Sequence, residues 1–350
     1  MGNKRRFTAI NTKVRVLKSK LLDRKDYLQL MEKEGLRSQV NYLKENTAYN
    51  EVLDNLADLD DIYEVEICLK RHFMHQYNKL IPYFTGEYRK LLKSMLLRFE
   101  IEDIKYFLRA LDRREDLSKA ANSMILNEHY SKLDINKLSK SRNLEEFIEG
   151  LKGTIYYDIL KPYINEGQQK ILFYMEMNLD RFYFNLLKNQ SLKLDKEDSI
   201  LYGEVLGKNI DLLNIQWIYR GLKFYSLSPE ELINYTLSNG YEFNYEKIKK
   251  MCYSTEDKLK EIVLSSRYDF LFDTENDVDL YMERRTERYL FYQFLNTFKR
   301  GKFDITTVIA YIHLLEYEIR DIISILEAKK YGLSSNEIKE FLVRKIEGSD

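Results

Sequence analysis

The chain has 350 residues, of which 44% are hydrophobic and 32% are charged, so it carries enough apolar side chains for a packed core. Its 56 basic residues balance 56 acidic ones, which argues against a general nucleic-acid binder, because phosphate contacts need an excess of Lys and Arg. Two cysteines, Cys68 and Cys252, are too few for a secreted disulfide scaffold and favour a reducing compartment. We find no apolar run of the ~18–20 residues that span a bilayer, and no signal peptide.

Apolar residues follow helical spacing from the N-terminus onward. Val14, Leu17 and Leu21 lie on one face of a predicted first helix, and similar stripes recur to the end of the chain. Later helices carry start signals: Ser228–Glu231 offers an N-cap serine followed by proline, and Ser334–Glu337 has capping-box spacing. There are only three prolines, and no alternating stretch is long enough to build a sheet. The sequence therefore predicts an all-α fold.

Two sequence elements occur three times in the same order, at intervals of roughly 107 to 111 residues. The first is a glutamate followed five residues later by an arginine, and the second is one polar residue inside an apolar stripe. Copies of the first are Glu66/Arg71, Glu176/Arg181 and Glu283/Arg288, and copies of the second are Asp103, Asn214 and Asp321. A third element is clear at Thr47–Tyr49 and Thr154–Tyr156, and its third copy would fall near Ser254–Thr255, where the match is poor.

These intervals predict three similar multi-helix repeats, with boundaries at residues 1–112, 113–223 and 224–350. Such repeats can stack as a solenoid or close into a ring or funnel with pseudo-threefold symmetry, and periodicity alone does not decide between these arrangements.

The repeated polar residues are predicted to be structural. A Glu and an Arg five residues apart do not face each other along one helix, so each either reaches a neighbouring helix or is solvated independently. The repeated Asp or Asn is expected to make a recurrent hydrogen bond that caps or bridges helices. No nucleophile or base accompanies it, which argues against catalysis.

The same segments resemble the C subunit of bacterial and archaeal V-type ATPases, the counterpart of the d subunit in the eukaryotic V-ATPase. The resemblance spans essentially the whole chain and is carried by Asn11–Leu22, Thr47–Tyr49, Glu176–Tyr183, Asp211–Ile215 and Glu316–Ser334. The chain departs from the family pattern at Asp321, where the last repeat often has Asn, and at Lys70–His72, a degraded copy of an Asp-Arg-Tyr-like element.

The resemblance implies an all-α, three-part funnel with a mechanical role. Its wide mouth would receive the D and F subunits of the rotating shaft, and its other face would rest on the cytoplasmic loops of the membrane proteolipid ring. The chain would then be a non-catalytic, peripheral subunit on the cytoplasmic side of the membrane, with no cofactor, no small-molecule substrate and no nucleic-acid partner. The choice between proton and sodium ions, and between ATP synthesis and hydrolysis, would lie elsewhere in the complex.

Two other interpretations stay open from the residues alone. A free-standing helical-repeat scaffold would have the same periodicity. Asp60 and Asp61 could hold Mg²⁺–diphosphate as in all-α isoprenoid synthases, because hard cations prefer carboxylate oxygens. The more ordinary interpretation is an N-capping turn before a helix, since Glu275–Asp279 is a poor second acidic motif.

Two further clusters have both a functional and an ordinary interpretation. His72 and His75 share one helical face at a spacing that can chelate a metal, but no third ligand stands at a familiar spacing, so we expect packing. The densest basic region either contacts anionic lipid headgroups or an acidic partner loop, or is a solvated helix face. It consists of Lys4–Arg6, Lys13, Arg15, Lys18 and Lys20.

Overall fold

The computed structural model describes residues 2–54, 56, 58–122, 131–164, 170–273, 277–300 and 303–346. Throughout these ranges the chain forms α-helices and short 3₁₀-helices joined by turns, without a strand, so the predicted all-α class is confirmed. None of the described helices combines the length and the apolar composition that a membrane crossing requires.

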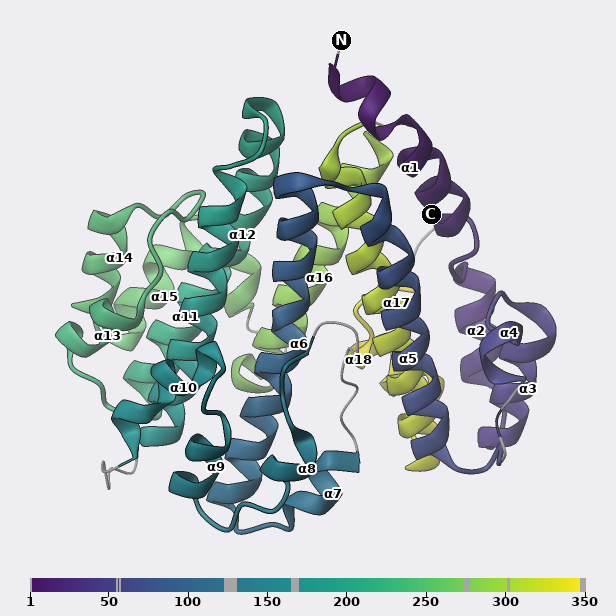
Figure 1. The fold of residues 1–350 in the computed structure, drawn as a ribbon, viewed down its shortest axis with the longest axis horizontal. Helices are drawn as coiled ribbons and strands as arrows, with labels where there is room; N and C mark the ends of the chain where they lie inside the picture. The colour runs from purple at the N-terminus through teal and green to yellow at the C-terminus, as the bar shows by residue number, and fades with distance from the viewer. Residues whose placement is uncertain are drawn as a thin grey trace. The chain divides into compact units, whose positions relative to one another are not determined.

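Runs of short helices separate pairs of long helices along the chain (Figure 1). The first are α1 (Gly2–Lys18), α2 (Arg24–Glu32), α3 (Leu36–Asn46), α4 (Asn50–Leu53), α5 (Ile62–Leu80), η1 (Ile81–Tyr83) and α6 (Gly86–Asp112). The next are α7 (Leu117–Asn122), α8 (Ile135–Leu138), α9 (Leu144–Gly150), α10 (Ile155–Leu160), η2 (Lys161–Tyr163), α11 (Ile171–Ser191) and α12 (Lys196–Lys223). The last are α13 (Pro229–Tyr235), α14 (Tyr245–Cys252), α15 (Glu256–Leu264), η3 (Asp269–Phe272), α16 (Val278–Lys299), α17 (Ile305–Lys330) and α18 (Ser335–Phe341).

A pair of long helices occurs three times. Helices α5, α11 and α16 have 19, 21 and 22 residues, and the longer α6, α12 and α17 that follow them have 27, 28 and 26. A short helix comes next each time, namely α7, α13 and α18. The order of elements thus recurs at the intervals found in the sequence. The arrangement of repeats about a threefold axis, and the boundaries at residues 1–112, 113–223 and 224–350, stay predictions.

The chain forms two compact units: unit 1 contains Met1–Phe84 and Ser266–Asp350, and unit 2 contains Thr85–Ser265. Within unit 1, α17 is the common partner of α1, α2, α3, α5, α16 and α18. Within unit 2, α6 packs along α11, while α12 contacts α11, α13, α14 and α15. Unit 1 therefore assembles helices from both ends of the chain around one central helix.

Side-chain caps set many of the helix starts. The predicted capping boxes are present, because Ser228 and Glu231 close one at α13, and Ser334 and Glu337 close one at α18. Each pair satisfies two backbone N–H groups that the first helical turn leaves without partners. Further N-caps are provided by Asp23, Asp61, Asp134, Asn143, Thr154, Asn244, Thr255, Asp277 and Asp304.

The third copy of the threonine–tyrosine element lies later than the sequence pattern predicted. The hydroxyl oxygens of Thr47 and Thr154 accept from the N–H of Tyr49 and Tyr156, two residues on. The same turn occurs at Ser266, whose hydroxyl accepts from the N–H of Tyr268 at 3.1 Å. The expectation near Ser254–Thr255 was wrong, because Thr255 instead caps α15 through the N–H of Lys258.

We predict that Gly240→Ala destabilises the protein by about 2 kcal/mol or more. A Cβ at Gly240 would overlap Oδ1 of the buried Asp211 and lie 2.9 Å from the carbonyl oxygen of Phe243, so it would disrupt the hydrogen bonds of that carboxylate. Thermal unfolding checks this. The control Gly203→Ala meets nothing within 4 Å on α12 and should be neutral or stabilising, since Ala favours helices. Equal melting temperatures for the two variants would contradict the prediction.

Candidate functional site

Two buried carboxylates on α17 connect distant parts of unit 1. Oε1 of Glu318 accepts from the Tyr49 hydroxyl at 2.8 Å, and Oε2 accepts from the Leu22 N–H at 2.7 Å. One turn later, Asp321 is fully buried and accepts from the N–H groups of Val343 and Arg344, at 2.7 and 3.0 Å. The Tyr27 hydroxyl also lies 3.3 Å from Asp321 Oδ2. One helix therefore holds both the N-terminal and the C-terminal segments by directional hydrogen bonds.

Corresponding positions of unit 2 carry related contacts. On α6, Oε2 of the buried Glu100 accepts from the Tyr156 hydroxyl at 2.6 Å, as Glu318 does from Tyr49. On α12, Asn214 exchanges two 2.8 Å hydrogen bonds with the backbone of Leu237. Asp211 of the same helix accepts from the N–H groups of Glu242 and Phe243, at 2.7 and 3.2 Å. The chain after α12 is thereby fixed to that helix.

The predicted position Asp103 differs from its two counterparts. Its side chain on α6 is half-buried, whereas Asn214 and Asp321 are fully buried. One turn earlier on α6, the buried Glu100 accepts a hydrogen bond that sequence reasoning missed. A glutamate in a chain with 56 acidic residues gives no sign of burial, and only its equivalence to Asp211 and Glu318 in the repeat could have singled it out.

The repeated arginines reach neighbouring helices and not their own glutamates. Arg181 donates to the carbonyl oxygen of Asn234 at 2.6 Å, near the end of α13. Arg288 donates to the carbonyl oxygens of Lys339, Glu340 and Leu342 at the end of α18, at 3.2, 2.7 and 2.9 Å. Both arginines thus bind the carboxyl end of the short helix that follows the long pair, where carbonyl groups lack helical partners. The exposed Arg71 lines a groove on α5.

The repeated glutamates have three different environments. Glu176 forms an ion pair with Arg109 of α6, with Nε 2.6 Å from Oε1. Glu66 lies 3.6 Å from Lys70 and beside Glu327, and burial followed by the neighbouring Glu327 raises its pKa against the pull of Lys70. Glu283 is exposed. The repeated glutamate therefore does not make the same contact in the three copies.

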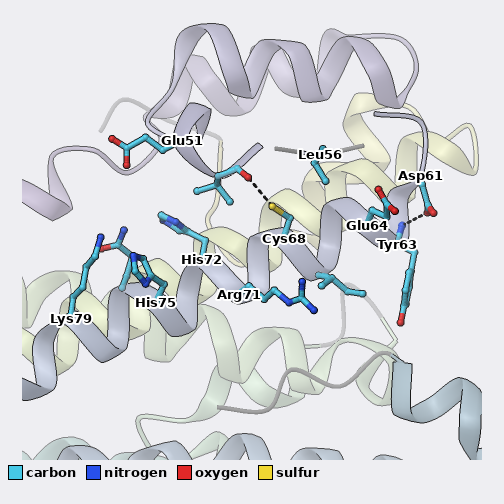
Figure 2. Close-up of a pocket in the computed structure, with 13 residues that line it drawn as sticks. Glu51, Leu56, Asp61, Tyr63, Glu64, Cys68, Arg71, His72, His75 and Lys79 are labelled. Atoms are coloured by element: carbon cyan, nitrogen blue, oxygen red, sulfur yellow. Dashed lines mark hydrogen bonds between the residues drawn. The ribbon is translucent and has the colours of Figure 1, made fainter. Parts of the chain in front are cut away.

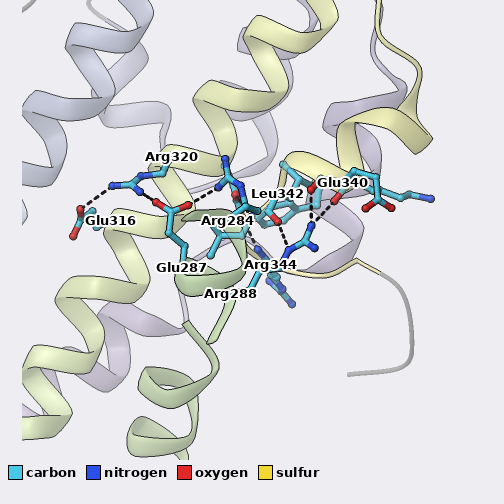
Figure 3. A network of polar contacts seen from close by, with 12 residues as sticks. Arg284, Glu287, Arg288, Glu316, Arg320, Glu340, Leu342 and Arg344 are labelled. Carbon is cyan, nitrogen blue, oxygen red and sulfur yellow. Dashed lines mark hydrogen bonds and ion pairs between the residues drawn. The ribbon is translucent and has the colours of Figure 1, made fainter. Parts of the chain in front are cut away.

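A second polar network, shown in Figure 3, joins α16 to α17. The buried carboxylate of Glu287 accepts from Arg284 at 2.9 Å and pairs with Arg320, which also lies 3.4 Å from Glu316. Arg288 extends the network to α18. Sequence reasoning missed Glu287, because its partners come from a different helix and leave no local pattern.

A groove of about 740 Å³ runs along α5 in unit 1 and is shown in Figure 2. His72 and His75 line it, and the His72 ring packs 5.5 Å from that of Tyr49. Burial, and then the neighbouring His75, lowers the pKa of His72 to about 4, so this ring is neutral at physiological pH. Across the described ranges, no three His, Cys, Asp or Glu side chains are placed to hold a metal ion together.

The acidic stretch before α5 has structural partners. Asp61 caps the helix by accepting from the Tyr63 N–H at 2.9 Å, which confirms the capping interpretation. Asp60 is exposed and pairs with Arg37, and the hydrogen bond from Arg37 lowers the pKa of this carboxyl. Of the proposed second acidic motif, Glu275 and Asn276 lie outside the described residues, and Asp277 caps α16.

Comparison with known proteins gives one consistent family. The family model described as "ATP synthase (C/AC39) subunit" matches residues 10–341. The A-type ATP synthase C subunit of Methanosphaera stadtmanae is 24% identical over 349 residues, which cover 96% of this chain and 88% of the relative. The protein of the same name from Methanocaldococcus jannaschii is 25% identical, with 96% and 86% covered. That of Archaeoglobus fulgidus is 24% identical, with 98% and 97% covered.

The contact between Glu100 and Tyr156 generates a test of the buried hydrogen bonds. Tyr156→Phe leaves the buried carboxylate without that donor, so we expect a loss of about 1–3 kcal/mol in the free energy of unfolding. The adjacent Tyr157 donates to Glu149 at the surface, so Tyr157→Phe is a matched control that should change stability by less than about 0.5 kcal/mol. Chemical denaturation measures both, and a control that lost as much would refute the assignment.

A second test uses pH. Burial raises the pKa of Glu318 from 4.5 to about 8 and that of Asp321 from 3.8 to about 6, despite hydrogen bonds that oppose the shift. Because the folded-state pKa values lie above the unfolded ones, the native state binds more protons, and this contribution to stability is lost as pH rises through about 8. We expect the melting temperature to fall between about pH 4.5 and 8 and this contribution to level off above pH 8. The fall should be smaller in Glu318→Gln, and an identical fall in both proteins would contradict the assignment.

Proposed function

Because the chain belongs to the ATP synthase (C/AC39) subunit family, we propose that it is a non-catalytic central-stalk subunit of a rotary ATPase. In this role it couples the D and F subunits of the rotating shaft to the membrane proteolipid ring, on the cytoplasmic face of the membrane. The observation that carries the proposal is the family match from residue 10 to residue 341. The relatives that are named as C subunits of A-type ATP synthases support it over nearly the same length.

The packing of the units suits a part that transmits torque. Closely packed helices resist deformation because interior side chains have few voids into which to move. Apolar packing alone is not directional, whereas the hydrogen bonds of Glu318 and Asp321 each need particular donors. A displacement of α17 away from the segments that carry these donors would leave buried carboxylates without partners, at a cost of several kcal/mol. Such contacts keep helices in register under load.

Chemical observations are consistent with a mechanical role. Glu318 and Asp321, whose pKa values burial raises, are occupied by tyrosine hydroxyls and backbone N–H groups and not by a nucleophile. Asp60 and Asp61, the pair proposed for Mg²⁺–diphosphate, are engaged by Arg37 and by the start of α5. These carboxylates therefore have structural tasks that account for their presence.

Reconstitution tests the proposal directly. We predict that a rotary complex assembled without this chain hydrolyses ATP but transports no ions, and that adding the chain restores transport together with stoichiometric binding to the D/F shaft and the ring. The physical reason is that torque needs a continuous mechanical connection. Full ion transport without the chain, or a failure of the purified chain to bind either partner, would refute the proposal.

A pair of variants adds a graded test. Ile322 on α17 is fully buried, so Ile322→Asp places an unpaired charge in the core and should abolish both incorporation and transport. Ile322→Val removes one methylene at a cost of about 0.5–1.5 kcal/mol and should preserve both. Unchanged transport with Ile322→Asp would contradict a role for this helix in coupling.

A further inference from the structure

Cationic and exposed aromatic side chains lie together in unit 1 near the place where α1 packs beside α17 (Figure 1). The Lys13 ammonium lies 3.1 Å from the hydroxyl of Tyr83 and 4.7 Å from its ring centroid. The Arg15 guanidinium lies 5.7 Å from the ring of Phe298 and 5.8 Å from that of Phe303. These contacts join α1 to η1 on one side and to Phe298 and Phe303 on another. We define the basic end as Lys13, Arg15, Val16, Tyr83 and Phe303, together with the exposed Arg300, which follows Phe298 by two residues.

The basic end exposes apolar surface that a solvated helix face would not need. Val16 is 56% exposed, Tyr83 46% and Phe303 40%, although each is large and hydrophobic. Exposed apolar side chains are ordinary when scattered, but here they share a surface with cations that pack on their rings. Aromatic rings beside Lys and Arg are the composition that favours the interface between membrane and water.

Charge at the basic end is one-sided. Residues 11–20 and 79–84 contain no acidic residue, and residues 296–304 contain only Asp304. Asp304 is buried, and its carboxylate caps α17 by accepting from the N–H groups of Thr306 and Thr307. Within the described ranges, no carboxylate lies within ion-pair distance of Lys13, Arg15 or Arg300. The positive charge is therefore not neutralised inside unit 1.

Arg15 has an unmet hydrogen-bonding group. Its Nε is buried, and no acceptor among the described residues lies within hydrogen-bond distance. That nitrogen is enclosed, so an external acceptor can meet only the exposed remainder of this half-buried side chain. A guanidinium offers a planar fork of donors that matches the oxygens of a phosphate. The preferred acceptor is thus an anionic oxo group beside an apolar surface.

We propose that the basic end docks on the phosphate headgroups of anionic lipids at the membrane surface, with Phe303, Tyr83 and Val16 in contact with the headgroup layer. This inference rests on the proposed function, which places the chain beside a membrane. A lipid surface satisfies both features, because it offers phosphate oxygens to Arg15 and an apolar layer to the exposed rings. A free anion would use only the cations and leave the apolar surface uncovered.

The test is co-flotation of the purified full-length chain with lipid vesicles. We expect strong binding to vesicles of phosphatidylcholine and phosphatidylglycerol in equal parts, and weak binding to phosphatidylcholine alone. Lys13→Gln with Arg15→Gln should lower the partition coefficient about thirtyfold, and Arg300→Gln about fivefold, from the usual contribution of a cation near an anionic surface. Salt should weaken wild-type binding, because it screens charge.

Lys249→Gln with Lys250→Gln removes the same charge from two exposed positions of unit 2 and should change binding less than twofold. Phe303→Ser should weaken binding and leave its salt dependence unchanged, and thermal unfolding verifies that each variant folds.

Equal binding to both vesicle types, equal losses in the two double variants, or full competition by inorganic phosphate would each overturn the inference. Dependence on Lys13 and Arg15 for binding to a lipid-free proteolipid ring, without vesicle binding, would also overturn it in favour of an acidic protein loop. A failure of the proposed function can be distinguished from these outcomes, because it would appear as ion transport by a complex that lacks the chain.

Discussion

The structure depends on satisfying carboxylates that are buried on the longest helices. Glu318 and Glu100 stand at corresponding positions of α17 and α6, and each accepts a hydrogen bond from a tyrosine hydroxyl, at 2.8 and 2.6 Å. A buried carboxylate that lacks donors costs several kcal/mol, so the segments that carry the donors must pack on these helices. In unit 1 the donors come from Leu22, Tyr49 and the last described turn of the chain. This requirement brings both ends of the chain onto α17.

Polar side chains of the long helices also bind the carboxyl ends of the short helices α13 and α18 that follow them. Arg181 and Arg288 bind the final carbonyl groups of α13 and α18, and the polar residues Asn214 and Asp321 bind the backbone that follows. Each short helix thus begins with a capping box and ends on an arginine. The recurrence of this design in two copies gives a physical reason for the spacing of the repeated residues.

Much of the fold could be predicted from the sequence, because helices are encoded locally. Apolar spacing, few breakers and the capping boxes at Ser228 and Ser334 are all properties of neighbouring residues, and each corresponds to an observed helix. The repeat interval was visible because equivalent positions keep similar chemistry. The third turn at Ser266 was misplaced because serine there replaces threonine.

The candidate site was harder to predict because its contacts join residues far apart in sequence. Glu287 and Arg320 pair between two helices, and Glu176 pairs with Arg109 rather than with Arg181. In a chain with 32% charged residues, no local pattern marks which charges are buried. The predicted Asn214 and Asp321 do accept hydrogen bonds from the backbone, but the further acceptors Glu100 and Glu318 lie one turn before predicted positions.

The most direct measurement is a double-mutant cycle on Tyr49 and Glu318, with unfolding free energies for Tyr49→Phe, Glu318→Gln and the double variant. If their hydrogen bond anchors the N-terminal helices to α17, the two changes are coupled by about 1–3 kcal/mol. Losses that add within about 0.5 kcal/mol would contradict the account, because the hydrogen bond between Tyr49 and Glu318 would then contribute nothing to stability.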